Sequence, residues 1–171
     1  MKKNLILTGM MGVGKSTIGK KLAKKLKYKF SDIDKIIENK EKNTIKLIFE
    51  NKGESYFRKI EKKTTLEELK KNNLVIALGG GAFLDNAVRK EIKNSCISFW
   101  LDLNIKTLLT RLKNAKKRPL LNQNNLEDSI NKIYSMRKKI YNEASFKIQC
   151  NSMDKTEIVY KIIKLYEKSG N

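Results

Sequence analysis

The residues best suited to chemistry lie in one glycine-rich stretch, Gly9 to Thr17, which reads GMMGVGKST and matches the pattern GxxxxGKS. Glycines let a backbone turn so that successive amide N–H groups point inward and form a nest for anions. In such a loop Lys15 can reach the β- and γ-phosphates of a nucleotide, Ser16 can bind Mg²⁺, and Thr17 lies near the α-phosphate. The plain alternative is a glycine-rich turn beside a lysine-rich helix. The complete pattern favours a nucleotide-binding loop.

The segments on either side of this loop are a predicted strand and a predicted helix. Residues 5–7 form an apolar run, and apolar side chains recur at helical spacing over residues 18–26. The phosphate-binding pattern requires this context, because the loop amides then continue into the partially positive N-terminus of the helix.

Two carboxylates follow the second predicted strand, which runs from Tyr28 to Ile33. Alternate side chains of a strand share a face, so we expect Asp32 and Asp34 to point to one site. A phosphate loop nearby needs a carboxylate for Mg²⁺ and a group that orients the nucleophile. Alternatively, Asp34 is the N-cap of the helix that follows, or one aspartate is a cap while the other binds a ligand.

An arginine and a run of glycines follow in the next two elements. Arg58 and Glu61 lie three residues apart on a predicted helix, so the carboxylate can hold the guanidinium in place, although an ordinary surface ion pair has the same spacing. Gly79, Gly80 and Gly81 come directly after the apolar run 74–78, which is typical of a strand buried on both faces of a parallel sheet. Three glycines there leave backbone amides open to a ligand, and a flexible turn is the alternative.

The second half of the chain continues the alternation of helices and strands. Strands are predicted at 96–101 and 146–150, and helices from about 105, from 126 to about 141 and from 156 to 168. Asp85 is expected to cap the helix after the glycines, and Arg89 in that helix to be exposed. The spacing of Tyr134, Arg137 and Tyr141 places all three on one helix face.

A polar and basic segment, 113–125, interrupts this alternation and contains the only proline. It predicts a mobile lid in which Arg118 closes over phosphates, and a disordered connector is the alternative.

Strands that alternate with helices predict parallel βαβ units and a three-layer α/β/α sheet structure covered on both faces. In such sheets ligands bind at the carboxyl ends of the strands. The phosphate loop, the two aspartates and the three glycines all lie at such ends, so we expect them to converge on one cleft.

Composition limits the class of protein. A chain of 171 residues suffices for one well-buried domain, 1–171. Its net charge of +20 suggests anionic partners, but only 5 of the 38 basic residues are arginines, and lysine-covered helix faces without a nucleic-acid partner are the simpler interpretation.

No signal peptide or membrane span is evident, which predicts a cytoplasmic protein with no membrane partner. Cys96 and Cys150 are expected to be buried free thiols, without further ligands for a metal.

Taken in order, the motifs GxxGxGKST, DxD, GExxFRxxE, GGG, RPLL and RxxxY resemble those of the shikimate kinase family over essentially the whole chain. The resemblance implies a monomeric P-loop kinase of the nucleoside monophosphate kinase fold class, with a five-stranded parallel sheet of order 2-3-1-4-5. It also implies that ATP, with Mg²⁺ as cofactor, phosphorylates the 3-hydroxyl of shikimate in the pathway to chorismate and the aromatic amino acids.

The same resemblance assigns roles on the nucleotide side. The amides of residues 12–17 would hold the phosphates together with Lys15, Arg118 would reach them from the lid, and Arg111 would stack on adenine. Ser16 would bind Mg²⁺ directly and Asp32 through water. The ATP-binding set is therefore Gly12, Val13, Gly14, Lys15, Ser16, Thr17, Arg111 and Arg118.

On the acceptor side the resemblance implies a substrate-binding region at about 33–61 and contributions from later elements. Asp34 would bind shikimate hydroxyls and act as a base, which makes Lys15, Asp34 and Arg118 the catalytic set. Arg58 and Arg137 would clamp the substrate carboxylate, and Glu61 would orient Arg58. Backbone contacts would come from Gly79, Gly80 and Gly81.

Other functions remain open at this stage. Paired arginines suit any anionic acceptor, so a kinase for gluconate or a nucleoside monophosphate is the nearest alternative, although DxD and GGG favour a polyhydroxylated carboxylic acid. A basic nucleic-acid-binding NTPase is a second alternative, which the net charge motivates. The loop 151–154 departs from the family because it lacks the proline associated with the adenine pocket.

Overall fold

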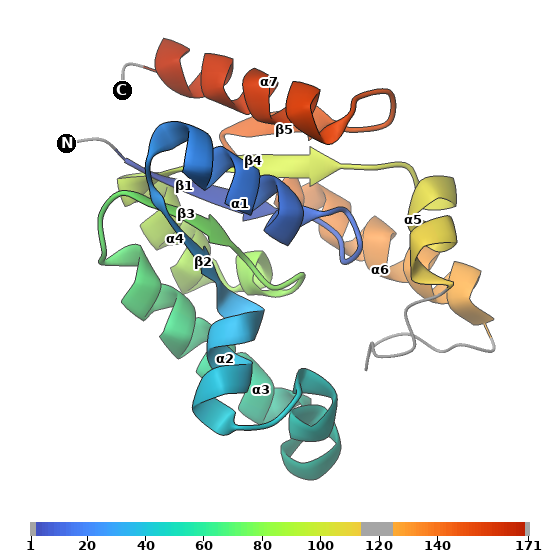
Figure 1. The fold of residues 1–171 in the computed structure, drawn as a ribbon. Helices are drawn as coiled ribbons and strands as arrows, with labels where there is room; N and C mark the ends of the chain where they lie inside the picture. The colour runs from blue at the N-terminus through green and yellow to red at the C-terminus, as the bar shows by residue number, and fades with distance from the viewer. Residues whose placement is uncertain (1–2, 114–124, 170–171) are drawn as a thin grey trace.

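The centre of the molecule is a five-stranded sheet in which every neighbouring pair of strands is parallel (Figure 1). This is a computed structural model, and it describes residues 3–113 and 125–169. The strand order is β2-β3-β1-β4-β5, as the family resemblance implied. The strands are β1 (Asn4–Thr8), β2 (Lys29–Asp32), β3 (Leu74–Ala77), β4 (Cys96–Asp102) and β5 (Phe146–Gln149).

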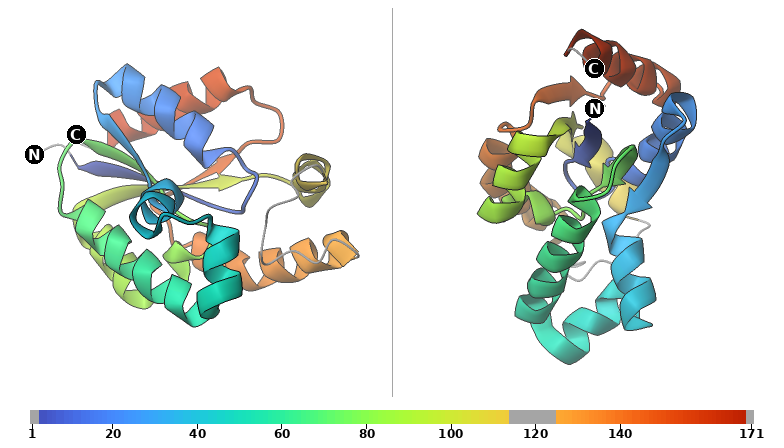
Figure 2. Two further views of the ribbon diagram at one scale, coloured as in Figure 1. Left: turned by 60° about the horizontal axis from the view of Figure 1, so that its bottom comes forward. Right: turned by 90° about the vertical axis from the view of Figure 1, so that its left-hand side faces the viewer.

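Helices cover both faces of the sheet, which confirms the predicted three-layer arrangement. Helices α1 (Lys15–Leu26) and α7 (Lys155–Lys168) lie together on one face, and α3 (Ile45–Leu69), α4 (Asn86–Ser95) and α6 (Leu126–Tyr141) lie on the other (Figure 2). The remaining helical elements are α2 (Ile33–Glu41), η1 (Ala82–Leu84) and α5 (Ile105–Leu112). None of the described helices is both long enough and apolar enough to cross a bilayer.

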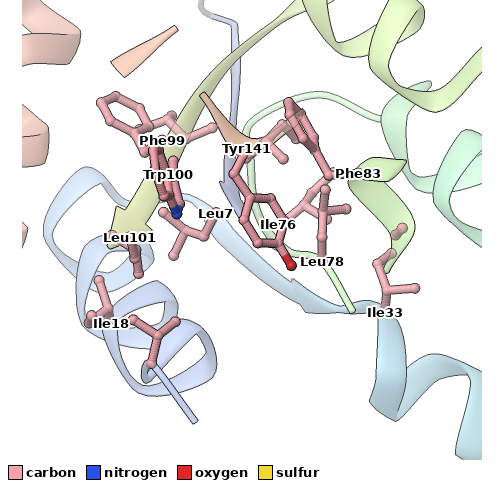
Figure 3. Packing of buried hydrophobic residues seen from close by; sticks show 14 of the residues in the cluster. Leu7, Ile18, Ile33, Ile76, Leu78, Phe83, Phe99, Trp100, Leu101 and Tyr141 are labelled. Atoms are coloured by element: carbon pink, nitrogen blue, oxygen red, sulfur yellow. The ribbon is translucent and has the colours of Figure 1, made fainter. Parts of the chain in front are cut away.

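The inner strands are apolar because both of their faces are covered. Every residue of β1 and β3 is buried, and the largest fully buried side chains include Trp100, Tyr141, Phe83 and Phe99 (Figure 3). The ring of Trp100 lies 6.0 Å from that of Tyr141, which joins β4 to α6. Cys96 and Cys150 are buried free thiols, as predicted.

The boundary between β2 and α2 differs from the prediction. The strand ends at Asp32, and the helix begins at the next residue. Asp32 is therefore the N-cap, accepting a hydrogen bond from the backbone N–H of Lys35 at 3.4 Å, and Asp34 lies in the first helical turn. Of the alternatives left open, the one that makes Asp34 the cap is wrong, because no residue separates the strand from the helix; the alternative in which one of the two aspartates is a cap agrees with Asp32. Asp32 still has extended backbone angles, which a cap requires.

The helix after the glycines begins with the predicted cap, but one of its side chains is less exposed than predicted. Asp85 caps α4 by accepting from the N–H groups of Ala87 and Val88 at 2.9 and 3.0 Å. Arg89 was expected to be exposed, yet only 13% of its side chain is exposed. Its guanidinium donates to the carbonyls of Phe83 and Leu84 at 3.0 and 2.7 Å. The reason is that η1 turns its carbonyls back toward α4, where Arg89 satisfies them.

Candidate active site

A cavity of about 650 Å³ lies at the carboxyl ends of the strands, where the phosphate loop, the two aspartates and the glycine turn meet. Its walls come from the phosphate loop, the end of β2, α2, α3, the glycine turn and α6. The expected convergence on one cleft is thereby confirmed. The polar groups and glycines that line it include Ser16, Asp32, Asp34, Arg58, Glu61, Gly80, Gly81 and Arg137.

The phosphate loop joins β1 to α1 through glycines with left-handed backbone angles. Gly9 has φ of 135°, and a Cβ there would lie 2.5 Å from the carbonyl oxygen of Leu101, so a side chain would collide with β4. Nζ of Lys15 lies over the loop and donates to the carbonyls of Gly9 and Met10 at 2.9 and 3.0 Å. A small cavity lined by Gly12, Gly14, Lys15, Ser16 and Thr17 connects this loop to Asp32, Asp34 and Gly80. These are the predicted phosphate-binding residues, with the amides of the α1 N-terminus beside them.

Oxygen donors suited to Mg²⁺ lie side by side at the end of this loop. The Ser16 hydroxyl donates to Oδ2 of Asp32 at 2.6 Å, while the other carboxylate oxygen of Asp32 caps α2. No cluster of three or more His, Cys, Asp or Glu side chains occurs in the part of the chain that the structure describes. Mg²⁺ commonly binds through one or two protein oxygens together with substrate phosphates and water, and this pair fits that mode.

Arg58 is held between two carboxylates on α3. Its Nη1 donates to Oε2 of Glu61 at 2.6 Å, and its Nη2 and Nε donate to Oε1 of Glu54 at 3.0 and 3.2 Å. The motif GExxFRxxE contains both glutamates, but only Glu61 was assigned a role, although the spacing of four between Glu54 and Arg58 is also a signal for such a pair. The guanidinium is therefore fixed in orientation before any ligand binds.

Glu61 is the most buried carboxylate of the cavity, with only 2% of its surface exposed. Burial raises the pKa of Glu61; Arg58 opposes that shift, and the charge of Asp34 adds to it. Within the described ranges its Oε1 has no hydrogen-bond partner. An alanine Cβ at Gly79 would lie 2.3 Å from this Oε1 and 2.7 Å from Oδ1 of Asp34, so both carboxylates approach the glycine turn closely.

The three glycines make room for side chains of the site, which sequence reasoning did not predict. A Cβ at Gly81 would lie 2.3 Å from Nη1 of Arg58, and one at Gly80 would lie 3.2 Å from Nη1 of Arg137. The backbone angles of the turn are ones that alanine can adopt; Gly81 has φ of −108°. The run of glycines is therefore explained by the space that the functional groups need, in addition to the predicted access of a ligand to its amides.

Helix α6 brings Arg137 to the wall of the cavity. Arg137 is 7% exposed, and its Nη1 donates to the Gly80 carbonyl at 2.8 Å. The hydroxyl of Tyr141 donates to the same carbonyl. Tyr134 lies on the same helix, but its hydroxyl donates to Asp102 at 3.0 Å. Burial and, to a lesser extent, the hydrogen bond and charge of Asp102 raise the pKa of Tyr134 to about 12. Tyr141 is a site residue that the motif RxxxY contained and sequence reasoning left without a role.

A separate cavity of about 420 Å³ lies between the phosphate loop and the start of α7. Val13, Gly14, Arg111, Met153 and Asp154 are among the residues that line it. Nη1 of Arg111 donates to the carbonyls of Gly12 and Val13 at 3.3 and 3.2 Å, so its guanidinium lies against the phosphate loop. Arg118 lies outside the described residues, as does most of the predicted lid.

A comparison with protein-family models decides between the alternatives that the sequence left open. The model described as "Shikimate kinase" matches residues 11–167. The chain belongs to the shikimate kinase family. Members of this family are P-loop kinases with a parallel sheet, and they use ATP as co-substrate.

Individual members of the family agree over nearly the full length of the chain. A shikimate kinase of Sulfurihydrogenibium sp. is 43% identical over 161 residues, covering 94% of this chain and 96% of the relative. That of Thermodesulfovibrio yellowstonii is 38% identical and covers 99% and 98%. The structure of shikimate kinase from Acinetobacter baumannii in complex with shikimate is 34% identical, covers 98% of this chain and 94% of that chain, and has a TM-score of 0.94.

The alternative acceptor kinases share the fold at a greater distance. A gluconokinase from Sinorhizobium meliloti has a TM-score of 0.64 but is only 15% identical. This likeness shows a common fold and leaves the choice of acceptor to the residues of the cavity.

Proposed function

We propose that this chain transfers the γ-phosphate of ATP to the 3-hydroxyl of shikimate, giving shikimate 3-phosphate and ADP on the route to chorismate and the aromatic amino acids. The observation that carries the proposal is the cavity beside the phosphate loop. In this cavity two arginines, Arg58 and Arg137, converge with carboxylates that include Asp34 and Glu61, in a chain of the shikimate kinase family. The solved relative from Acinetobacter baumannii, which holds shikimate, has a TM-score of 0.94 to this chain.

The acceptor subsite matches the groups of a polyhydroxylated carboxylic acid. Arg58 and Arg137 enter the cavity from α3 and α6, and each is oriented by protein hydrogen bonds, which suits a planar carboxylate. Asp34 offers acceptor oxygens for hydroxyl groups and lies next to the phosphate loop. We propose Asp34 as the group that binds the reacting hydroxyl and takes up its proton, and Glu61 as the support of Arg58. Backbone contacts to the acceptor are proposed for Gly79, Gly80 and Gly81.

The phosphate side stabilises charge without covalent chemistry. Phosphoryl transfer proceeds through a loose transition state, so positioning and charge neutralisation matter most. We propose that Lys15, the amides of 12–17 and Arg118 supply positive charge around the phosphates, with Arg111 against adenine. Mg²⁺, held by Ser16 and through water by Asp32, would neutralise charge on the phosphate oxygens when bound. The contact between the Ser16 hydroxyl and Asp32 at 2.6 Å supports this pair.

The proposal extends to the location, assembly and partners of the protein. We propose a cytoplasmic monomer in which residues 1–171 act as one domain with a lid at 113–125, and with neither nucleic acid nor membrane as partner. One sheet carries all the described strands, which supports the single domain. Six of the lysines on α2, α3 and α4 form ion pairs with neighbouring carboxylates, which favours ordinary solvated helix faces over a dedicated nucleic-acid surface.

The test is ADP release by the purified chain with Mg-ATP alone and with shikimate, gluconate or AMP. Stimulation by shikimate but by neither other acceptor is the expected result. Stimulation by gluconate or AMP instead would keep the nucleotide site and overturn the roles proposed for Asp34, Arg58 and Arg137.

A further inference from the structure

The hydroxyl of Tyr141 is a buried polar group to which the proposed reaction gives no role. Tyr141 is 0% exposed and packs among the core side chains (Figure 3), with its ring 6.0 Å from that of Trp100. This packing fixes the position of the hydroxyl, which donates to the carbonyl of Gly80. Burial raises the pKa of Tyr141, so the hydroxyl keeps its proton at neutral pH and remains a donor.

The Gly80 carbonyl links this hydroxyl to the acceptor cavity. Nη1 of Arg137 donates to the same oxygen at 2.8 Å, and Arg137 lines the cavity. Residues four apart on a helix lie on one face, so Tyr141 and Arg137 both reach the glycine turn from α6. The peptide that carries this carbonyl also carries the N–H of Gly81, which points in the opposite direction because the peptide is trans. Fixing one oxygen therefore fixes a guanidinium and a peptide plane of the site.

We propose that Tyr141 is a positioning residue for the acceptor subsite: by holding the Gly80 carbonyl, its hydroxyl keeps Arg137 and the 80–81 peptide in the geometry that binds the substrate carboxylate. This inference rests on the proposed function. Without the hydroxyl, Arg137 is the remaining side-chain donor to that carbonyl among the described residues. The guanidinium alone must then satisfy the buried carbonyl that it now shares with Tyr141, which leaves it less free to bind the substrate and weakens substrate binding more than it weakens the fold.

The decisive variant is Tyr141→Phe, which keeps the ring packed against Trp100 and removes only the hydroxyl. Tyr134→Phe is the matched control, because it removes a hydroxyl from the same helix whose partner, Asp102, lies outside the cavity lining. Calorimetry measures the dissociation constants for shikimate and for Mg-ADP, and a melting curve measures stability. For Tyr141→Phe we expect the shikimate constant to rise about tenfold, as for one lost hydrogen bond to a buried acceptor, and the Mg-ADP constant to stay within about twofold. The melting temperature should fall by less than about 4 °C.

A double-mutant cycle shows whether the effect passes through the arginine. In an Arg137→Ala background, Tyr141→Phe should weaken shikimate binding clearly less than in the wild type, because only the 80–81 peptide is then left for the hydroxyl to position; an equal loss in both backgrounds would overturn the role of the arginine. Tyr134→Phe should leave both dissociation constants within about twofold of the wild type.

Three results would overturn the inference alone: wild-type shikimate affinity in Tyr141→Phe, an equal loss of affinity for both ligands, or an equal loss in Tyr134→Phe. A wild-type chain that binds Mg-ADP but neither binds nor phosphorylates shikimate would remove the proposed function itself, and the inference with it.

Discussion

Replacing Gly81 by alanine should damage the acceptor site without disturbing the backbone. A Cβ at this position would lie 2.3 Å from Nη1 and 2.7 Å from Cζ of Arg58. To reach an ordinary contact of 3.4 Å the guanidinium must move by about 1 Å, which disturbs the geometry of its 2.6 Å contact with Glu61. The backbone at residue 81, with φ of −108°, accepts alanine readily. The change therefore isolates the room that Arg58 needs.

The size of the effect follows from the hydrogen bonds that Arg58 would lose to a carboxylate. Hydrogen bonds that involve charged groups contribute about 1.5–3 kcal/mol, and about 1.4 kcal/mol corresponds to a tenfold change. We therefore expect kcat/KM for shikimate to fall by about 10- to 150-fold in Gly81→Ala, with KM for ATP within about twofold of the wild type. Folding should survive, because overpacking costs about 1–3 kcal/mol and the loss of glycine entropy in the unfolded chain offsets up to about 1 kcal/mol.

Gly80→Ala provides a graded comparison at the neighbouring position. A Cβ there would lie 3.2 Å from Nη1 of Arg137 and 3.7 Å from the Met11 nitrogen, so its neighbours must shift by only a few tenths of an ångström. A coupled assay that varies shikimate and ATP separately should therefore find a smaller loss than in Gly81→Ala. Circular dichroism and melting curves check that both variants fold. Wild-type shikimate kinetics in Gly81→Ala, or a larger loss in Gly80→Ala, would refute the argument from space.

Three further predictions concern pH, thiols and capping. Burial raises the pKa of Glu61 above its ordinary 4.5, so the stability that protonated Glu61 contributes is present below that pH and is lost as the pH rises through the folded-state pKa. The free energy of unfolding of Glu61→Gln, relative to that of the wild type, should therefore rise between pH 4 and 7 in urea titrations. A flat or falling difference would contradict this. Burial raises the pKa of Cys150 to about 11, so a thiol reagent at pH 8 should label the native chain slowly. The same reagent should react quickly with both cysteines in guanidinium chloride. Fast labelling of Cys150 in the native chain would contradict its burial. Asp85→Ala should lower the free energy of unfolding by about 1 kcal/mol and the melting temperature by about 2–4 °C, because it removes the cap of α4 together with a partly exposed ion pair to Lys62 that contributes little. Kinetics should be unchanged, and a loss of activity would show that Asp85 also supports the site.

The sheet was predictable because its signals are local. The buried runs of β1, β3 and β4 and the helical spacings between them predicted parallel βαβ units, and the Gly9–Thr17 pattern located the phosphate loop between β1 and α1. The strand order came from the resemblance alone, since periodicity within a strand contains no information about its neighbours.

Contacts between distant residues were the part that the sequence did not reveal. Asp32, and not Asp34, caps α2, because a cap signal does not say whether a strand runs directly into a helix. The glycine turn was expected to open amides to a ligand, but the closeness of Arg58 and Glu61 to Gly81 and Gly79 depends on how α3 packs against the end of β3. Arg89 was misjudged for a similar reason, because its acceptors are carbonyls that only the turn of η1 brings near.

The most direct test of the central claim is the identity of the product formed from Mg-ATP and shikimate, with phosphorus and proton NMR used to locate the new phosphate. The proposed function predicts one shikimate phosphorylated on the 3-hydroxyl for each ADP formed, and the cavity, with Asp34 next to the phosphate loop and Arg58 and Arg137 in its wall, supports this placement of the acceptor. If the only products were ADP and inorganic phosphate, or if the phosphate were on another hydroxyl, the proposed placement of the acceptor would be contradicted.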